Sequence, residues 1–182
     1  MKLYVYNVQT QKAVPMKKLV ICRHAKSSWD DPRLSDHERP LSNRGLRDAP
    51  MMAARIHTNR IFPEKILTSD ALRAKMTAEF YLKVFEKMEV GYEVSDAFYM
   101  ASETALLKEV KKTNNKIDTL FIFGHNPGLT ELINYLGEPL ENLPTAAIMG
   151  FKFDENNWEN ISSNNASFWI YDFPKNKSPK IF

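Results

Sequence analysis

The sequence contains only one cysteine, Cys22, among its 182 residues. A single cysteine excludes an internal disulfide and a multi-cysteine metal cluster, and it is typical of proteins in a reducing compartment. No apolar run approaches the ~18 residues that a membrane span needs, and no run of arginine or lysine exceeds two residues. We therefore expect a cytoplasmic protein that contacts neither a membrane nor a nucleic acid.

The four histidines do not have the spacing of a metal site. None lies four residues from another, and there is no cysteine pair to complete a zinc site. We expect neither a metal nor a cofactor. We take His37, in a polar loop, and His57, near a helix end, as surface residues, and Cys22 as a small core residue.

Length and composition favour one globular domain. The chain is 43% hydrophobic and 12% aromatic, which suffices for a core, and its net charge of +3 is mild. Residues 1–15 lack the apolar segment of a signal peptide, and Met16 is a more natural beginning. We expect residues 1–15 to be an extension, either disordered or the result of a start codon placed upstream, and residues 16–182 to form the domain.

Apolar strand-like runs alternate with helical patterns along the chain. We expect strands at 18–22, 65–68, 91–94, 119–123, 146–153 and 167–172, and helices at 42–58, 70–88, 102–113 and 127–136. This alternation predicts a three-layer α/β/α sandwich with a mostly parallel central sheet. The last two strands have no helix between them and should form an antiparallel edge pair.

Charged and nucleophilic residues follow two of the predicted strands. Arg23-His24 follows one apolar run, and His125 follows another, directly before a helix that we expect Asn126 to cap. Arg73 lies three residues past Asp70, the expected cap of another helix, and should point toward the same end of the sheet. Two guanidiniums and two imidazoles at one rim would suit a phosphoryl group.

Each of these residues also has an ordinary structural interpretation. A lone histidine after a strand is more often structural than catalytic, and an arginine in a first helical turn is usually a solvated surface charge. The phosphoryl-site hypothesis depends on convergence of the four side chains, which the sequence alone does not show.

Several motifs resemble, in order, those of the histidine phosphatase superfamily, and together they look like its SixA-type phosphohistidine phosphatase branch. The resemblance spans about residues 16–172 and implies a phosphoglycerate mutase-like fold. Ala25 stands where the family usually has glycine. The motifs are Val20–Trp29, Arg39–Gly45, Thr68–Ala74, Gly124–Gly128 and Leu143–Ala146.

The resemblance also implies roles for individual residues. His24 would be the nucleophile, with one ring nitrogen held by a backbone carbonyl, and Arg23, Arg73 and a charged His125 would bind the phosphoryl oxygens. Asn126 and Ser27 are further candidates for substrate binding.

No general acid stands out in the sequence. Glu103 and Asp30 are candidates for an acid or for a residue that orients an arginine, although Glu103 is equally suited to complementing a helix dipole. A missing acid would suit a phosphoramidate, whose leaving nitrogen can arrive protonated, better than an alkyl phosphate. Only residues 95–101 separate a strand from the next helix where larger relatives carry a cap, so the site should be open.

The sequence therefore predicts a metal-independent phosphatase with a covalent phosphohistidine intermediate. Its expected substrate is phosphohistidine in a protein, and the expected state is a monomer or weak dimer. One alternative is a phosphatase of small phosphate monoesters, and another is a non-catalytic module that binds phosphoproteins.

Overall fold

The computed structural model describes residues 16–178 and 180–181. The expectation for residues 1–15 lies outside this part of the chain. The described strands are β1 (Lys17–Arg23), β2 (Lys65–Ser69), β3 (Gly91–Ser95), β4 (Thr119–Gly124), β5 (Ile148–Phe153), β6 (Ala166–Asp172) and β7 (Lys180–Ile181). The α-helices are α1 (Asn43–Thr58), α2 (Leu72–Val84), α3 (Glu103–Lys111) and α4 (Gly128–Tyr135), and the 3-10 helices are η1 (Asp36–Glu38), η2 (Asp96–Phe98) and η3 (Trp158–Asn160).

The described strands form one sheet in the order β3-β2-β4-β1-β5-β6-β7. Neighbours among β3, β2, β4 and β1 are parallel, whereas β5 is antiparallel to both β1 and β6, and β6 is antiparallel to β7. The predicted antiparallel pair is thus confirmed. Its predicted position at the edge is wrong, because β5 lies inside the sheet and the short β7 covers β6.

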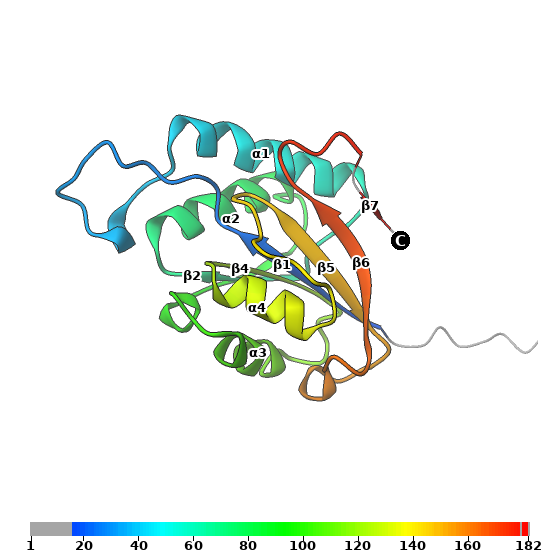
Figure 1. The fold of residues 1–182 in the computed structure, drawn as a ribbon. Helices are drawn as coiled ribbons and strands as arrows, with labels where there is room; N and C mark the ends of the chain where they lie inside the picture. The colour runs from blue at the N-terminus through cyan, green and yellow to red at the C-terminus, as the bar shows by residue number, and fades with distance from the viewer. Residues whose placement is uncertain (1–15, 179, 182) are drawn as a thin grey trace, which may run out of the picture.

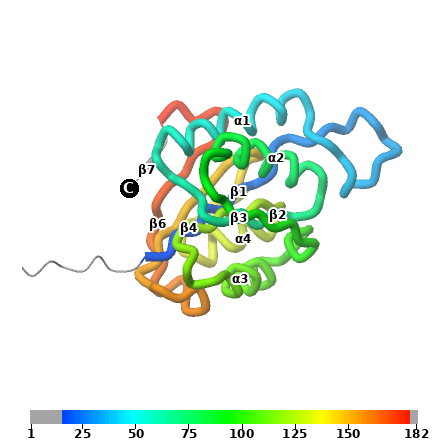
Figure 2. Tube along the Cα trace, turned by 180° about the vertical axis from the view of Figure 1, so that it is seen from behind, coloured from blue at the N-terminus to red at the C-terminus, as the bar shows by residue number. Residues whose placement is uncertain are grey.

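The sheet is the middle of three layers, as predicted (Figure 1). Helices α1 and α2 cover one face, and α3 and α4 cover the other; the view from behind shows the same arrangement around β3 (Figure 2). In β1, Leu19 and Ile21 join the core under α3 and α4, whereas Val20 and Cys22 join the core under α1 and α2. Because alternate side chains enter opposite cores, the middle of β1, Leu19–Cys22, is apolar at every position.

The ends of the parallel strands meet at one edge of the sheet. Arg23, the last residue of β1, pairs with Gly124, the last residue of β4, and β2 ends nearby at Ser69 after pairing with β4. This register brings the residues that follow β1 and β4 together. In open α/β sheets, ligands bind at this carboxyl edge.

Both predicted helix caps near this edge are wrong. Ala71, not Asp70, is the N-cap of α2, and the Asp70 carboxylate instead lies 3.0 Å from Nε2 of His37. Helix α4 begins at Gly128, and the Nδ2 atom of Asn126 donates to the carbonyl oxygen of Leu143 at 3.1 Å. In both cases a long-range partner outcompetes local capping.

A long loop between β1 and α1, residues 24–42, projects beyond the layers and carries η1 (Figure 1). Helix α1 holds the base of this loop at Gly45, where a Cβ atom would lie only 2.3 Å from the Lys26 carbonyl oxygen. The connection from β3 to α3 contains only η2 and a few further residues, so no large cap is inserted there, as expected. Within the described residues, no helix has the length and apolar character to cross a membrane.

Candidate active site

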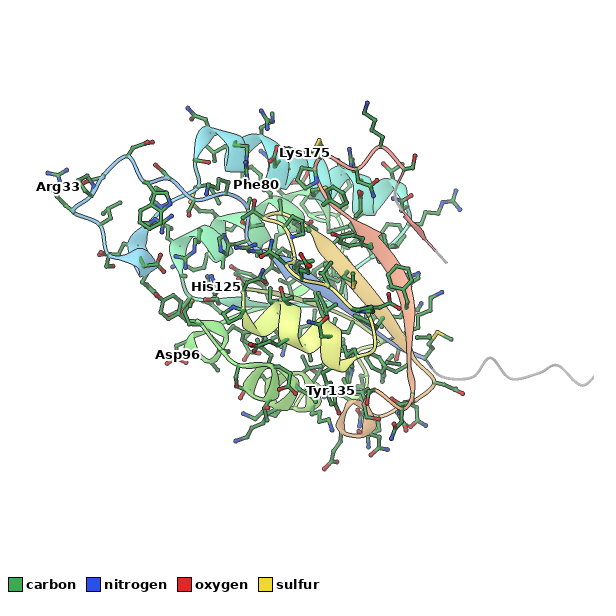
Figure 3. All side chains as sticks on the ribbon, in the orientation of Figure 1. Arg33, Phe80, Asp96, His125, Tyr135 and Lys175 are labelled. Atoms are coloured by element: carbon green, nitrogen blue, oxygen red, sulfur yellow. The ribbon has the colours of Figure 1, made fainter. Side chains whose placement is uncertain are left out.

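The four residues singled out from the sequence converge on one cavity. Arg23, His24, Arg73 and His125 all line a cavity of about 330 Å³ at the carboxyl edge of the sheet. Ser27 and Asn126 also line it. Figure 3 shows His125 at this edge, above the start of α4. This convergence favours a common site over four separate structural roles for these residues.

His24 is fixed in one tautomer by its two ring nitrogens. Its Nδ1 atom lies 2.7 Å from the carbonyl oxygen of Ala25, which can only accept, so Nδ1 carries the proton. Its Nε2 atom accepts from Nε of Arg73 at 3.4 Å. The backbone carbonyl expected beside one ring nitrogen is thus present, and the Nε2 lone pair faces the arginine.

Arg73 is buried, and Asp36 holds its guanidinium. Nη2 donates to the Asp36 carboxylate at 2.8 Å, and Nη1 donates to the Asp36 backbone carbonyl. The same carboxylate accepts from Nη1 of Arg39 at 2.8 Å and from the Tyr99 hydroxyl at 3.1 Å. Asp36 therefore ties the projecting loop to α2 and to the segment after β3.

His125 has the opposite tautomer from His24. Its Nδ1 atom lies 3.3 Å from Nη2 of Arg73, which can only donate, so the proton sits on Nε2, which is 2.9 Å from the Ser69 hydroxyl. The two imidazole rings pack at a centroid distance of 4.9 Å. Arg73 thus donates to an unprotonated nitrogen of each histidine.

Burial keeps both histidines neutral in the free site. It lowers the pKa of His24 to about 3, although the bond to Ala25 opposes the shift and nearby Arg73 adds to it. Burial also lowers the pKa of His125 to about 3, reinforced by His24 and Arg73. The positive charge expected on His125 is therefore absent near pH 7 in the free site.

Arg23 and Asn126 reach the cavity from the ends of neighbouring strands. Nη1 of Arg23 donates to the Leu143 carbonyl oxygen at 2.6 Å, while its buried Nε has no hydrogen-bond partner among the described residues. The buried Oδ1 of Asn126 likewise lacks a partner within the described part of the chain. Burial lowers the pKa of Arg23, and the neighbouring charge of Arg73 adds to that shift. Two guanidinium groups that line the same cavity suit an incoming anion.

The projecting loop forms one wall of the cavity, which the sequence motifs did not predict. The hydroxyl of Ser27 accepts from the buried Arg39, whose guanidinium lies 3.2 Å from the centre of the Trp29 ring. Trp29 is 70% exposed. Arg39, Trp29 and Asp36 line the cavity together with Lys26.

The two candidate acids lie elsewhere. Neither Glu103 nor Asp30 lines the cavity: Glu103 accepts from the hydroxyl of Thr104 at 2.8 Å, and Asp30 is exposed. Asp36 is the carboxylate among the cavity-lining residues, and sequence reasoning missed it. Burial raises its pKa, but Arg73, Tyr99 and Arg39 outweigh that effect and leave the pKa below its usual value. The sequence did offer a clue to Asp36, because Arg39, three residues after it, begins one of the family motifs.

His37 is more than a surface residue. Besides its contact with Asp70, its ring packs edge-on against Tyr99 at a centroid distance of 4.8 Å. It therefore braces the projecting loop against α2 and η2. His57 is exposed, and Cys22 is buried in the core, where burial raises the pKa of its thiol.

The fold and the site together define an α/β protein with a cavity that is lined by two histidines and an excess of cationic side chains. Residues 19–113 match the histidine phosphatase superfamily (branch 1), more than half of the chain. The chain belongs to this superfamily and is a histidine phosphatase.

Known relatives extend this similarity. An uncharacterised chloroplast protein of Arabidopsis thaliana is 34% identical over 79% of this chain and 69% of its own length. The phosphohistidine phosphatase SixA of Escherichia coli K12 is 27% identical, over 78% of this chain and 92% of its own. These matches agree with the expected SixA-type resemblance.

Solved structures share the fold. A putative phosphohistidine phosphatase SixA from Agrobacterium tumefaciens superposes with a TM-score of 0.73 at 21% identity, covering 87% of this chain and 98% of its own. A phosphoglycerate mutase from Bacillus anthracis superposes with a TM-score of 0.65 at 13% identity, covering 85% and 92%. The predicted phosphoglycerate mutase-like fold is confirmed.

Proposed function

We propose that the chain removes phosphate from phosphohistidine in proteins, by a metal-independent route through a covalent intermediate on His24. The observation that carries this proposal is the tautomer of His24. Its proton is held on Nδ1 by the Ala25 carbonyl, which leaves Nε2 unprotonated, with a lone pair that accepts from Arg73 until a phosphoryl group binds. A neutral imidazole with an oriented lone pair is a competent nucleophile near pH 7.

The surrounding cations supply charge stabilisation. In the first step the Nε2 lone pair forms a bond to phosphorus while the bond from phosphorus to the substrate's nitrogen breaks. The guanidinium groups of Arg23 and Arg73, which both line the cavity, would bind the phosphoryl oxygens. Phosphoryl transfer depends mainly on such positioning and electrostatic stabilisation.

His125 binds an oxygen only after it gains a proton. Its Nδ1 atom faces Arg73 as an acceptor in the free site. A dianionic phosphoryl group beside it favours the imidazolium form, which then donates from both nitrogens. In the second step water attacks phosphorus, the bond to His24 breaks, and phosphate leaves.

The state of Asp36 favours a phosphoramidate substrate. A general acid must carry a proton, but this carboxylate is ion-paired with Arg73 and Arg39 and its pKa is lowered. A phosphohistidine leaving group takes its proton on the distal ring nitrogen and departs as neutral imidazole. An alkyl phosphate would have to release an alkoxide without such help. The single carboxylate thus supports phosphohistidine over a simple monoester.

Turnover of a small set of substrates tests the proposal. We expect free phosphohistidine and a phosphohistidine peptide to be hydrolysed with kcat/KM at least about a hundredfold above glycerol phosphate, the order of effect that general acid catalysis supplies. p-Nitrophenyl phosphate, whose leaving group needs no acid, should be hydrolysed as well. A preference for glycerol phosphate or sugar phosphates would favour the monoester alternative. A protein without phosphoryl transfer from any donor that still binds phosphoprotein would be the binding module.

A histidine-phosphorylated protein is the proposed partner, and the chain is proposed to act in the cytoplasm as a monomer or weak dimer. Size-exclusion chromatography with light scattering at two concentrations tests the last point.

A further inference from the structure

A second cavity adjoins the active site. It measures about 360 Å³ and shares Thr145 with the catalytic cavity. Three segments distant in sequence form it: α1, the residues before β5, and the segment after β6. Figure 3 labels Lys175, on the last of these segments, beside α1.

The lining of this second cavity combines apolar surface with positive charge. Apolar surface comes from Met51, Pro144, Phe173 and Pro174. The lining also carries three cations, Arg44, Arg47 and Lys175, and one carboxylate, Asp48, so positive charge exceeds negative by two. Such a lining suits a ligand that is partly apolar and partly anionic.

Arg47 neutralises the carboxylate of Asp48, so the positive charges of Arg44 and Lys175 exceed the negative charge of the lining. Arg47 donates to the buried Oδ1 of Asp48 from Nε at 3.0 Å and from Nη2 at 2.9 Å, which satisfies that oxygen. Arg44 forms a longer ion pair, 3.7 Å, with the other oxygen and also donates to Thr145 at 3.0 Å, at the boundary between the cavities. Lys175 is exposed and forms no ion pair with any residue that the structure describes.

We propose that this cavity is a subsite for the polypeptide next to the phosphorylated histidine, accepting an acidic side chain beside an apolar one. The inference rests on the proposed function and names its substrate class. Thr145 lies on both cavities, so a chain leaving the phosphorylated residue passes directly into the second. Lys175 and Arg44 attract the carboxylate, while Met51 and Phe173 cover the apolar side chain. Adjacent acidic and apolar groups are what successive residues of a peptide present.

Phosphohistidine peptides of defined flanks test the subsite. Short peptides phosphorylated on histidine would carry Glu-Leu, Lys-Leu or Gly-Gly on either side, with free phosphohistidine as the reference. We expect the wild-type kcat/KM for one Glu-Leu peptide to exceed that of its Lys-Leu counterpart at least about tenfold. Lys175→Glu should abolish or reverse this preference and leave free phosphohistidine turnover unchanged.

Lys177→Glu is the matched control. It makes the same charge change in the same segment but does not line the second cavity, so the preference should persist. Equal turnover of all peptides, or a Lys175→Glu variant indistinguishable from wild type, would overturn the subsite. So would preferential turnover of a small bisphosphate that is lost on Lys175→Glu, because the cavity would then serve a second phosphate. Failure to hydrolyse any phosphohistidine compound would instead refute the proposed function.

Discussion

The Arg73 guanidinium donates to unprotonated nitrogens of both histidines, His24 at 3.4 Å and His125 at 3.3 Å. The Arg73 guanidinium thus orients the lone pair of the proposed nucleophile, His24, and the lone pair of its neighbour, His125. Because Asp36 fixes that cation, the orientation of both rings depends on a residue in the projecting loop. Four expected outcomes test this arrangement.

Removal of the nucleophile should abolish turnover without unfolding the protein. We expect His24→Ala to lower kcat for phosphohistidine by at least about a thousandfold, since the variant lacks the nitrogen that is proposed to attack phosphorus. Wild type mixed with substrate and quenched in alkali should yield phosphorylated protein, whereas the variant should not. His57→Ala, at an exposed position, is the control and should behave like wild type. Substantial turnover by the His24 variant would refute the covalent route.

Asp36 should act as a positioning residue, so its replacement should lower kcat without weakening the binding of an anion. Asp36→Asn removes a negative charge from the cavity, so sulfate should bind at least as tightly as to wild type. At the same time kcat should fall by about tenfold or more, because Arg73 is no longer held by a charge-assisted hydrogen bond.

Asp31→Asn is the control for Asp36, since Asp31 lies in the same loop and pairs with the exposed Arg33. Isothermal titration with sulfate and steady-state kinetics give the two readouts. An Asp36 variant with unchanged kcat would show that Arg73 needs no such support.

The two buried histidines should make folding stability fall in mild acid. Their folded pKa values of about 3 lie below the ordinary value of 6.5, so the unfolded chain binds more protons between these limits. The contribution of these two histidines to stability is therefore fully present above about pH 6.5 and is lost as the pH falls toward 3, by up to ~1.4 kcal/mol per pH unit for each histidine. Urea unfolding at pH 5.0, 6.0 and 7.5 without phosphate measures the slope. His125→Gln should reduce it, and the same slope in wild type and variant would contradict the assigned neutrality.

Anion binding should take up a proton at His125. Sulfate does not titrate in the accessible range, so any pH dependence of its affinity belongs to the protein. We expect the affinity to increase as the pH falls, by up to about tenfold per pH unit, the limit for uptake of one proton. Titration calorimetry in buffers of different ionisation enthalpy counts that proton directly. His125→Gln should bind weakly with a flatter pH profile, and a flat wild-type profile would show that His125 does not become charged.

The sequence by itself determined the architecture and the proposed chemistry. Apolar runs such as Leu19–Cys22 must be buried on both faces, which requires a central strand with helices on either side. Such strands end at one edge of a parallel sheet, so Arg23-His24 and His125 were predictable as neighbours. Arg73 was predictable too, because it follows β2 within the first turn of its helix.

Only the tertiary structure decided what surrounds those residues. Asp36 reaches Arg73 across 37 positions of sequence, and Asn126 and Asp70 leave their expected caps for long-range partners. The second cavity unites α1 with segments near residues 144 and 174. No local periodicity encodes such contacts, because they depend on which surfaces the packed layers bring together. The sequence thus placed the proposed nucleophile, and the tertiary structure set its tautomer, the state of the nearby carboxylate and the surface for the rest of the substrate.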